Sequence, residues 1–177
     1  YRGRNILNWA LINDEKEFGI TVHYVDTGID TGDIILQRTF PITDDSNYGS
    51  LLNVSYTACA EILFEALVLL KNGKAERIPQ STIHNVGFYC SRREPGDEIL
   101  NWSQSSREVF NFVRAICRPG PMATSFCKGK YIKINRLSLV SSAPSYKGNC
   151  GQILAKTGGG FLVKTLDSFV EINEFST

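Results

Sequence analysis

Closely spaced cysteines are missing from this sequence, and their absence excludes two kinds of site. The 177 residues contain five cysteines, none in a C-x-x-C pair, and they are widely spaced: Cys59, Cys90, Cys117, Cys127 and Cys150. An odd number at such spacing fits neither a disulfide framework nor a zinc site. A reducing, cytoplasmic environment is therefore expected.

Long apolar runs are also missing. The sequence has no signal peptide, and its most apolar stretch, from Ile62 to Leu70, is short and contains Glu65. A membrane-spanning helix needs about 18 or more apolar residues, so we expect no membrane span. The sequence starts at Tyr1 and its only methionine is Met122. We therefore expect a piece of a longer protein.

An excess of one charge is absent as well. The 19 basic and 18 acidic side chains give a net charge of +1, which creates no whole-chain field for nucleic acid or anionic lipid. The charges are unevenly distributed, however. Residues 1–125 carry 12 basic and 15 acidic side chains, a net of −3, whereas residues 126–177 carry 7 and 3, a net of +4. A basic C-terminal lobe is predicted.

The remaining composition, 42% hydrophobic and 21% charged, is that of an ordinary globular protein. Periodicity predicts a helix over residues 5–13, strands over 19–26 and 33–42, and a long helix over 47–72. The predicted apolar face of the long helix consists of five residues: Leu52, Cys59, Leu63, Leu67 and Leu70.

The second half of the sequence predicts shorter elements than the first half. Residues 73–86 are polar and mixed, which predicts a surface linker, and residues 87–93 could form a strand. A helix is predicted over 106–117. Five short β-like runs follow, at 123–127, 131–140, 151–155, 160–165 and 169–175. Their even spacing suggests a small β-barrel or open barrel.

Asp30 is the strongest candidate for chemistry. It lies on a turn, flanked by Gly28 and Gly32, between the two predicted strands. A carboxylate placed there is held by a rigid scaffold and can face a cleft, although aspartate is also a common turn residue. His23 lies within a strand, where a hydrogen-bonded structural role is favoured over catalysis. Motifs of P-loops, dinucleotide sites and nucleophile elbows are missing.

Two basic clusters leave alternatives open. Tyr1-Arg2-Gly3-Arg4 precedes a helix and could hold a phosphate, or could be a solvated turn; the pair Arg92-Arg93 is a second candidate anion site. In the basic lobe four cations alternate with apolar residues, which could bind RNA but is also how a half-buried strand keeps one face wet. We favour the second reading for these four: Lys128, Lys130, Lys133 and Arg136.

The sequence resembles the folate-dependent formyltransferases. The resemblance rests on the run YRGRNILNWA at residues 1–10 and on GITVHYVDTGIDTGDII at residues 19–35. It continues through the long helix and the R-R-x-P-x-D…W stretch that starts at Arg92. It implies an α/β fold: the C-terminal half of a Rossmann-like formyltransferase domain over residues 1–93, followed by a connecting helix and a small open, OB-like β-barrel over residues 94–177.

Within this family, Arg-Gly-Arg followed by Leu-Asn-Trp is most similar to enzymes that formylate nucleotide-linked amino sugars. The resemblance therefore implies formyl transfer from N10-formyltetrahydrofolate to such an amine, with no metal, in the cytoplasm, as in lipopolysaccharide or O-antigen biosynthesis. Nucleic acid is the less favoured partner, a membrane partner is not expected, and a homodimer is left open.

The resemblance also assigns residues. Asp30 matches the family's catalytic aspartate, and the loop Asp26, Thr27, Gly28, Ile29 and Asp30 matches the one that faces the folate pterin. The positions that match the sugar-nucleotide site are Tyr1, Arg4, Asn8 and Arg93. The family's catalytic Asn and His belong to the motif N-x-H-x-S-x-L-P-x-Y-R-G, which this sequence enters at Tyr-Arg-Gly. We therefore expect the 177-residue piece alone to be inactive.

Two rival functions remain. Methionyl-tRNA formyltransferases usually carry Trp-Arg-Gly-Ala-Ala-Pro where this sequence has Tyr1-Arg-Gly-Arg-Asn-Ile6. A tRNA substrate would nevertheless explain the basic lobe. The other rival is a module that uses the same scaffold for binding only. The connection Arg118-Pro-Gly-Pro-Met122 departs from the family's usual Pro-x-Pro-Gly-Ala pattern, so the path of the chain into the barrel is not predicted.

Overall fold

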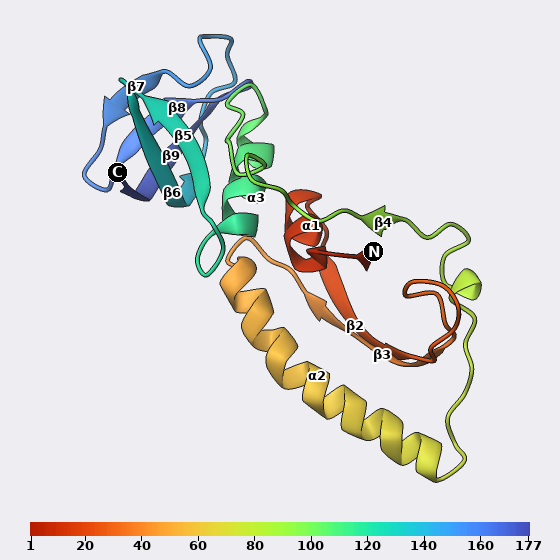
Figure 1. The fold of residues 1–177 in the computed structure, drawn as a ribbon. Coiled ribbons are helices and arrows are strands. Elements are labelled where there is room, and N and C mark those ends of the chain that lie inside the picture. The colour runs from red at the N-terminus through yellow and green to blue at the C-terminus, as the bar shows by residue number, and fades with distance from the viewer.

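Helix α3 (Ser106–Ile116) lies between the two regions of the molecule (Figure 1). The computed structural model describes all residues, 1–177. On one side of α3, residues 1–92 form helix α1 (Ile6–Ile12), two small sheets and the long helix α2 (Tyr48–Lys71). Residues 93–177 contain α3 itself and, on its other side, a five-stranded sheet. The fold is thus mixed α/β, with helices and sheets in both regions.

The predicted strand pair next to Asp30 is confirmed. Strands β2 (Glu17–His23) and β3 (Ile34–Pro41) pair antiparallel, and their β-branched and aromatic residues suit a pleated surface. Strand β2 ends at His23, three residues earlier than predicted. Beyond it, the residues from Val25 to Gly32 form no backbone–backbone hydrogen bonds and make the connecting loop.

Helix α2 is confirmed, together with its ends. Asn47 caps it: the Asn47 side chain accepts from the Ser50 amide, and the Ser50 hydroxyl accepts from the Asn47 amide. The helix ends before Gly73, whose φ of +65° favours glycine. The Asn47–Ser50 cap gives partners to backbone amides that would otherwise have none at the N-terminus of this 24-residue helix.

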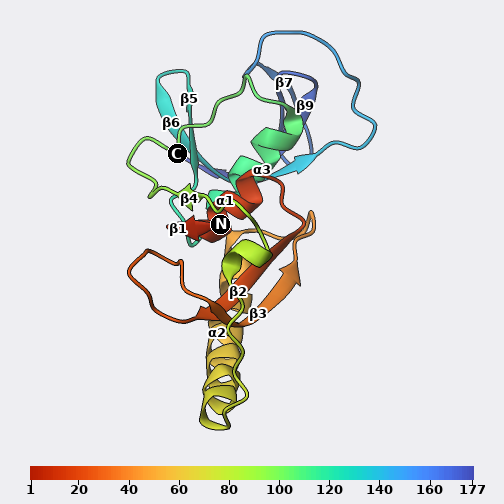
Figure 2. The ribbon, with the colours of Figure 1, turned by 90° about the vertical axis from the view of Figure 1, so that its right-hand side faces the viewer.

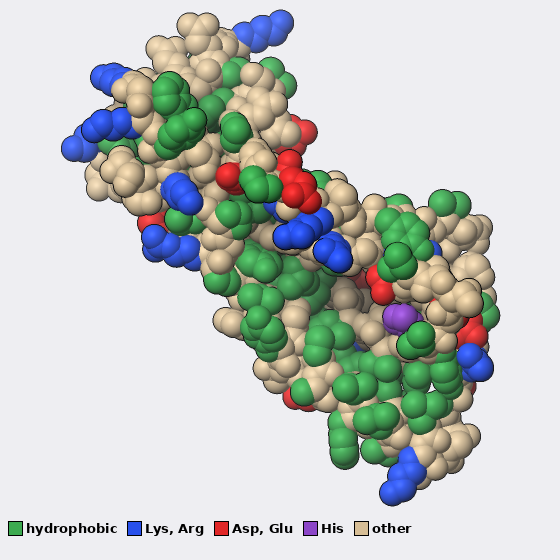
Figure 3. All heavy atoms as spheres, viewed as in Figure 1, with side chains coloured by type: hydrophobic (Ala, Val, Ile, Leu, Met, Phe, Trp, Pro, Cys, Tyr) green, Lys and Arg blue, Asp and Glu red, His purple; other side chains and the backbone are tan.

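The predicted apolar face of α2 is wrong. The residues that pack against β2 and β3 are Leu51, Ala58, Ile62 and Ala66, whereas Cys59, Leu63, Leu67 and Leu70 of the predicted face are exposed. Helix α2 is apolar on both sides, so periodicity alone could not tell which side is covered. Apolar side chains gather over this part of the surface (Figure 3). By length and composition α2 could cross a membrane, a test that core helices of soluble proteins also pass.

The predicted linker over residues 73–86 is more structured than expected. It contains the short 3-10 helix η1 (Gln80–Thr82), and Ile78 forms an antiparallel bridge with Ile34 at the start of β3. Of the strand predicted over residues 87–93, only β4 (Tyr89–Cys90) forms, and it pairs parallel with β1 (Arg2–Gly3). The linker therefore returns to the N-terminal residues, beside the β2–β3 loop.

The C-terminal sheet contains all five predicted strands, in the order β5-β6-β9-β8-β7. All its pairings are antiparallel. Strands β5 and β7 form its two edges and are not paired with each other, so closure into an OB-like barrel stays a prediction. The strands are β5 (Ala123–Cys127), β6 (Lys130–Leu139), β7 (Ile153–Lys156), β8 (Phe161–Lys164) and β9 (Phe169–Ser176).

The main core lies around α3. A cluster of 17 buried residues is centred on Val109, Val113 and Ile116 of α3 and reaches into both regions. Leu11 and Phe18 join it from the N-terminal side, and Ile134 and Val170 from the sheet. Because this core is continuous, it fixes the two regions against each other, and the predicted domain boundary at residues 93 and 94 stays a prediction. Away from this core, α2 projects from the molecule (Figure 2).

Candidate functional site

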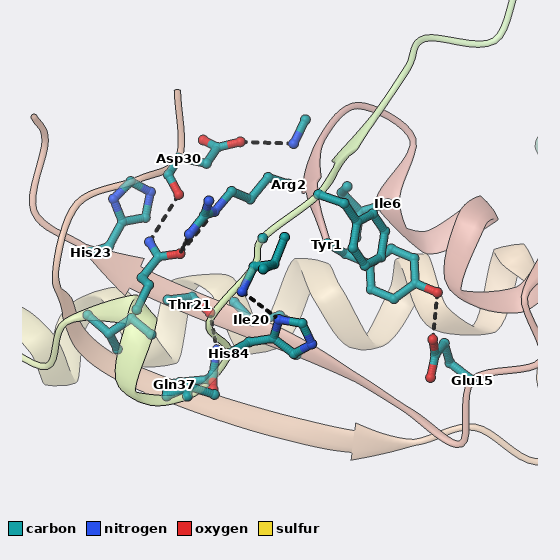
Figure 4. A pocket seen from close by; sticks show the side chains of 18 of the residues that line it. Tyr1, Arg2, Ile6, Glu15, Ile20, Thr21, His23, Asp30, Gln37 and His84 are labelled. Atoms are coloured by element: carbon teal, nitrogen blue, oxygen red, sulfur yellow. Dashed lines mark hydrogen bonds between the residues drawn. The ribbon is translucent and has the colours of Figure 1, made fainter. Parts of the chain in front are cut away.

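A cavity of about 570 Å³ lies between β1, β2, η1 and the loop that carries Asp30. It combines apolar walls with a few polar groups, as small-molecule sites do. Figure 4 shows Asp30, His23, Arg2 and His84 around it. Two of the predicted site residues, Tyr1 and Asp30, line this cavity.

Asp30 is held by its backbone and by one hydrogen bond. Its φ of 54° lies in the left-handed region, which aspartate tolerates better than most residues. The Gly3 amide donates to Asp30 Oδ2 at 3.1 Å, while Oδ1 has no hydrogen-bond partner in the chain. The carboxylate is thus fixed by one oxygen and leaves the other free for a ligand or another side chain.

The rest of the predicted folate loop is held by Asp26 and two glycines. The Thr31 hydroxyl and the Gly28 amide donate to Asp26 Oδ1 at 2.6 and 3.0 Å, and these bonds lower the pKa of Asp26. A Cβ at Gly28 would lie 2.1 Å from Thr31 Oγ1, and one at Gly32 would lie 1.7 Å from the Tyr24 carbonyl oxygen. The backbone path therefore requires glycine at position 32, whereas a side chain at position 28 would displace the Thr31 hydroxyl that bonds to Asp26.

Gln80 of η1 contacts this loop, although the sequence assigned no role to it. Its side-chain amide donates to the carbonyl oxygens of Asp30 at 3.0 Å and Gly32 at 2.7 Å, and its Oε1 accepts from Arg2. Residues 50 positions apart cannot be paired from local patterns. The only available signal was a lone glutamine in a polar segment.

The N-terminal residues form another wall of the cavity. The Tyr1 hydroxyl donates to Glu15 Oε1 at 2.6 Å, and burial together with this carboxylate raises the pKa of Tyr1. The Tyr1 ring packs edge-on against Phe88. Arg4 does not line the cavity; it is exposed and forms no ion pair. Its guanidinium is therefore free to meet an anion.

Asn8 and Arg93 lie outside this cavity. Asn8 is buried, and its side-chain amide donates to the Ala115 carbonyl of α3, so in this structure it joins α1 to α3. The Arg93 guanidinium donates to the Asp97 carbonyl and lies over the Phe112 ring, and burial lowers its pKa. The structure does not bring these two residues together with Asp30, and their substrate contacts stay predictions.

His23 lines the cavity beside Asp30 (Figure 4). Its Nδ1 lies 2.8 Å from the Tyr24 carbonyl oxygen. A carbonyl only accepts, so Nδ1 carries the proton when the ring is neutral, and Nε2 is then an acceptor. This bond agrees with the predicted structural role and also fixes the tautomer.

The predicted folate loop, residues 26–30, and the preceding Val25 have the chemistry to meet a flat heterocycle. Val25 and Ile29 are 94% and 70% exposed, and the backbone groups of Asp26 and Thr27 make no backbone–backbone hydrogen bonds. Free amide and carbonyl groups beside exposed apolar side chains could bind a ring with polar edges and apolar faces. A pterin has this chemistry.

Comparison with known families identifies the chain. Residues 1–67 match the family model for formyl transferase, and residues 93–177 match the model for the formyl transferase C-terminal domain. The chain belongs to the formyl transferase family. Both halves of the sequence carry the match, and the resemblance in the motifs is thereby confirmed.

Its sequence relatives in the formyl transferase family include methionyl-tRNA formyltransferases. The one from Pelotomaculum thermopropionicum is 37% identical over 79% of this chain and 44% of its own length. The one from Ruminiclostridium cellulolyticum is 32% identical over 98% of this chain and 55% of its own length. The chain thus spans about half the length of these relatives.

Similar solved structures include a sugar N-formyltransferase and HypX. An N-formyltransferase from Helicobacter canadensis, in complex with folinic acid and dTDP-3-aminofucose, matches 99% of this chain and 62% of its own, with a TM-score of 0.73 and 25% identity. HypX from Aquifex aeolicus in complex with tetrahydrofolic acid matches 98% of this chain and 30% of its own, with a TM-score of 0.71 and 26% identity. Both structures were solved with a folate.

Proposed function

We propose that this chain, within a protein of the length of its relatives, transfers a formyl group from N10-formyltetrahydrofolate to the amine of a nucleotide-linked amino sugar. In this reaction the neutral amine attacks the formyl carbon, and a new C–N bond forms. The bond from that carbon to N10 breaks, tetrahydrofolate leaves, and the attacking nitrogen loses a proton. An oxyanion develops on the formyl oxygen along the way.

Asp30 is the residue through which this chain takes part in the chemistry. Its carboxylate is anchored by the Gly3 amide at 3.1 Å and keeps Oδ1 unpartnered. A carboxylate held in this way orients a protonated imidazole or ammonium and favours its charged form. This is the role that the family resemblance gives to Asp30.

The loop from Asp26 to Asp30 is the proposed binding edge for the folate. Its free backbone groups and exposed Val25 and Ile29 suit a pterin ring. The folates bound to the two similar solved structures support this assignment.

The likeness to the Helicobacter canadensis enzyme is the observation that carries the sugar substrate. That enzyme was solved with dTDP-3-aminofucose, and the match covers 99% of this chain. In our proposal the exposed Arg4 and the ring of Tyr1 at the cavity wall contact the nucleotide. Such an enzyme would work in the cytoplasm and supply formamido sugars to lipopolysaccharide or O-antigen synthesis, and a homodimer would be compatible with it.

Transfer to methionyl-tRNA is the second candidate. The names of the sequence relatives favour it. The β5–β6 hairpin also presents an aromatic pair to solvent: Phe126 and Tyr131 are 64% and 70% exposed, with ring centroids 5.5 Å apart. Lys128 and Lys130 lie between these two residues in the sequence, at the hairpin turn. Aromatic rings beside lysines suit a nucleic acid strand.

An assay with both acceptors separates the candidates. The full-length protein is supplied with N10-formyltetrahydrofolate and either a thymidine diphosphate or uridine diphosphate amino sugar, or methionyl-tRNA. We expect transfer to the sugar amine. Transfer to methionyl-tRNA alone, with a kcat/KM that falls steeply as the salt concentration rises, would show that the acceptor is the tRNA and not the sugar.

A hairpin variant gives the matched control for this assay. The double change Phe126→Ser and Tyr131→Ser removes the exposed ring pair without touching the cavity. If the acceptor is a sugar, kcat/KM stays within about twofold of the unchanged enzyme. If the acceptor is tRNA, losing two stacking surfaces lowers kcat/KM by about tenfold or more.

A further inference from the structure

Gln80 forms four polar contacts that join two parts of the site. Arg2 donates to Gln80 Oε1 through Nε at 3.1 Å and through Nη2 at 2.6 Å. Gln80 Nε2 donates to the carbonyl oxygens of Asp30 at 3.0 Å and Gly32 at 2.7 Å. The 3-10 helix η1 therefore connects the N-terminal residues to the loop that carries Asp30 (Figure 4).

The chemistry of these partners requires a glutamine. Arginine only donates, so the oxygen of the side-chain amide must face Arg2. The nitrogen then faces two carbonyls, which only accept, and both of its N–H groups are used. A glutamate would keep the bond to Arg2 but would turn a carboxylate oxygen toward two carbonyl oxygens.

The loop has few other supports. From Val25 to Gly32 no backbone group bonds to another backbone group. Apart from Gln80, the contacts that tie this segment to the rest of the chain are the Tyr89 hydroxyl on the Ile29 carbonyl, at 3.0 Å, and the Gly3 amide on Asp30. Two of the four hydrogen bonds from outside the loop thus come from Gln80.

We propose that Gln80 is a positioning residue for formyl transfer: it holds the Asp30 carboxylate in place by clamping the Asp30 and Gly32 carbonyls to Arg2. This proposal rests on the proposed function for its effect on turnover. The clamp itself, formed by Arg2, Gln80 and the two carbonyls, has its own measurable signature, because the Gly3 amide bonds directly to the Asp30 carboxylate.

Gly87 gives a second, indirect way to open the clamp. A Cβ at Gly87 would lie 2.4 Å from Arg2 Nη1 and 2.7 Å from Arg2 Cζ. Gly87→Ala therefore displaces the guanidinium from Gln80 without changing Gln80 or Asp30. This variant tests the same clamp if Gln80→Glu fails to fold.

The experiment measures structure and turnover in the same full-length protein. In Gln80→Glu, amide hydrogen exchange at Gly3, followed by NMR, should rise about 30-fold, the effect of losing two hydrogen bonds of ordinary strength. Exchange at Leu162 in the distant sheet should not change. The kcat should fall by a similar factor, while KM for the amine stays within about twofold, since Gln80 is not proposed to touch the acceptor. Gly87→Ala should give a smaller change in the same direction.

Gln152→Glu is the matched control, because Gln152 directly precedes β7, is exposed, and its side chain forms no hydrogen bond. It should leave both measurements unchanged. Unchanged exchange at Gly3 in both clamp variants overturns the proposal, and so does faster exchange with normal kcat. If the unchanged enzyme formylates neither acceptor, the proposed function fails, and the exchange at Gly3 still decides for or against the clamp.

Discussion

In residues 93–177 two cationic side chains are buried, Arg114 at 6% exposure and Lys164 at 1%, whereas in residues 1–92 no charged side chain is buried. The Lys164 ammonium donates to the carbonyl oxygens of Tyr146, Thr165 and Ser168 at 2.7 to 3.0 Å. These carbonyls replace the water that the ion loses on burial. Lys164 thus holds loops of the C-terminal region together, whereas Arg114 donates to the Thr43 carbonyl and to Asp14 of the N-terminal region.

The N-terminal region uses its polar groups differently. Asp30 and Arg4 are exposed and largely unpartnered, and the polar side chains of Gln80 and Asp26 hold loops at the surface. Apolar groups show the same contrast, because α2 exposes residues such as Leu63 and Leu67 while the sheet covers Val163 and Val170. The two regions share one core, but the C-terminal region buries two charged side chains, whereas the N-terminal region buries none and carries the cavity.

The largest expected effect concerns Asp30. If the exposed carboxylate serves chemistry and not stability, Asp30→Asn in the full-length protein should lower the kcat of formyl transfer by about 10²–10⁴-fold. The free energy of unfolding should stay nearly unchanged, because an asparagine oxygen can still accept from the Gly3 amide. Steady-state kinetics and urea unfolding measure the two quantities. Near-normal turnover would remove the assigned role, and Asp45→Asn is the exposed control.

Lys164 should show the opposite behaviour. Lys164→Met leaves the carbonyl oxygens of Tyr146 and Thr165 without a donor and removes one of the two donors to Ser168, which should lower the free energy of unfolding by about 3 kcal/mol. Lys156→Met, at an exposed site in β7, should change it by less than about 0.5 kcal/mol. Urea unfolding of both variants makes the comparison. Equal effects would mean that the buried ammonium does not stabilise the C-terminal region.

Asp14 forms ion pairs that connect the N-terminal region to α3, so changing it tests how strongly the two regions are held together. It accepts from Lys16 at 2.9 Å and, in α3, from Arg107 at 2.6 Å and Arg114 at 3.3 Å. Partial burial raises the pKa of Asp14, but hydrogen bonds from Arg107 and Lys16 outweigh it and hold the pKa well below its usual range. Asp14→Asn should cost about 1–2 kcal/mol at pH 7, a figure reduced because Asp14 is partly exposed.

The same bonds predict a pH dependence. Because the pKa is lower in the folded than in the unfolded chain, the contribution of Asp14 is complete above the unfolded pKa. It declines as the pH falls below about 4. Urea unfolding across this range should show a smaller acid-induced loss in Asp14→Asn than in the unchanged protein. Identical pH curves for the two proteins would contradict this account.

The smallest expected effect concerns the exposed face of α2. Leu63→Ala should change the free energy of unfolding of the 177-residue chain by less than about 0.5 kcal/mol, because Leu63 is 51% exposed. Its neighbour Ile62 is fully buried, and Ile62→Ala should cost about 2–5 kcal/mol. A large cost at Leu63 would show that this face is covered in solution, which would weaken the contrast between the two regions.

Local patterns predicted most of the elements. The strands around Asp30, helices α1, α2 and α3 and all five C-terminal strands follow from alternation, helical spacing and turn residues. These signals act within a few residues along the chain, which is why they are legible in the sequence. The motifs also identified the family and directed attention to Asp30.

The tertiary structure decided which groups meet. It selected the buried face of α2, because both faces are apolar and only packing against β2 and β3 distinguishes Ile62 from Leu63. It placed Gln80 on a loop 50 residues away and Asn8 on Ala115, 107 residues away. Helical and strand periods carry no information about such distant partners, since those bonds form only when the core brings the segments together. The sequence by itself therefore determined the elements, the family and the candidate aspartate, and packing determined how that aspartate is held.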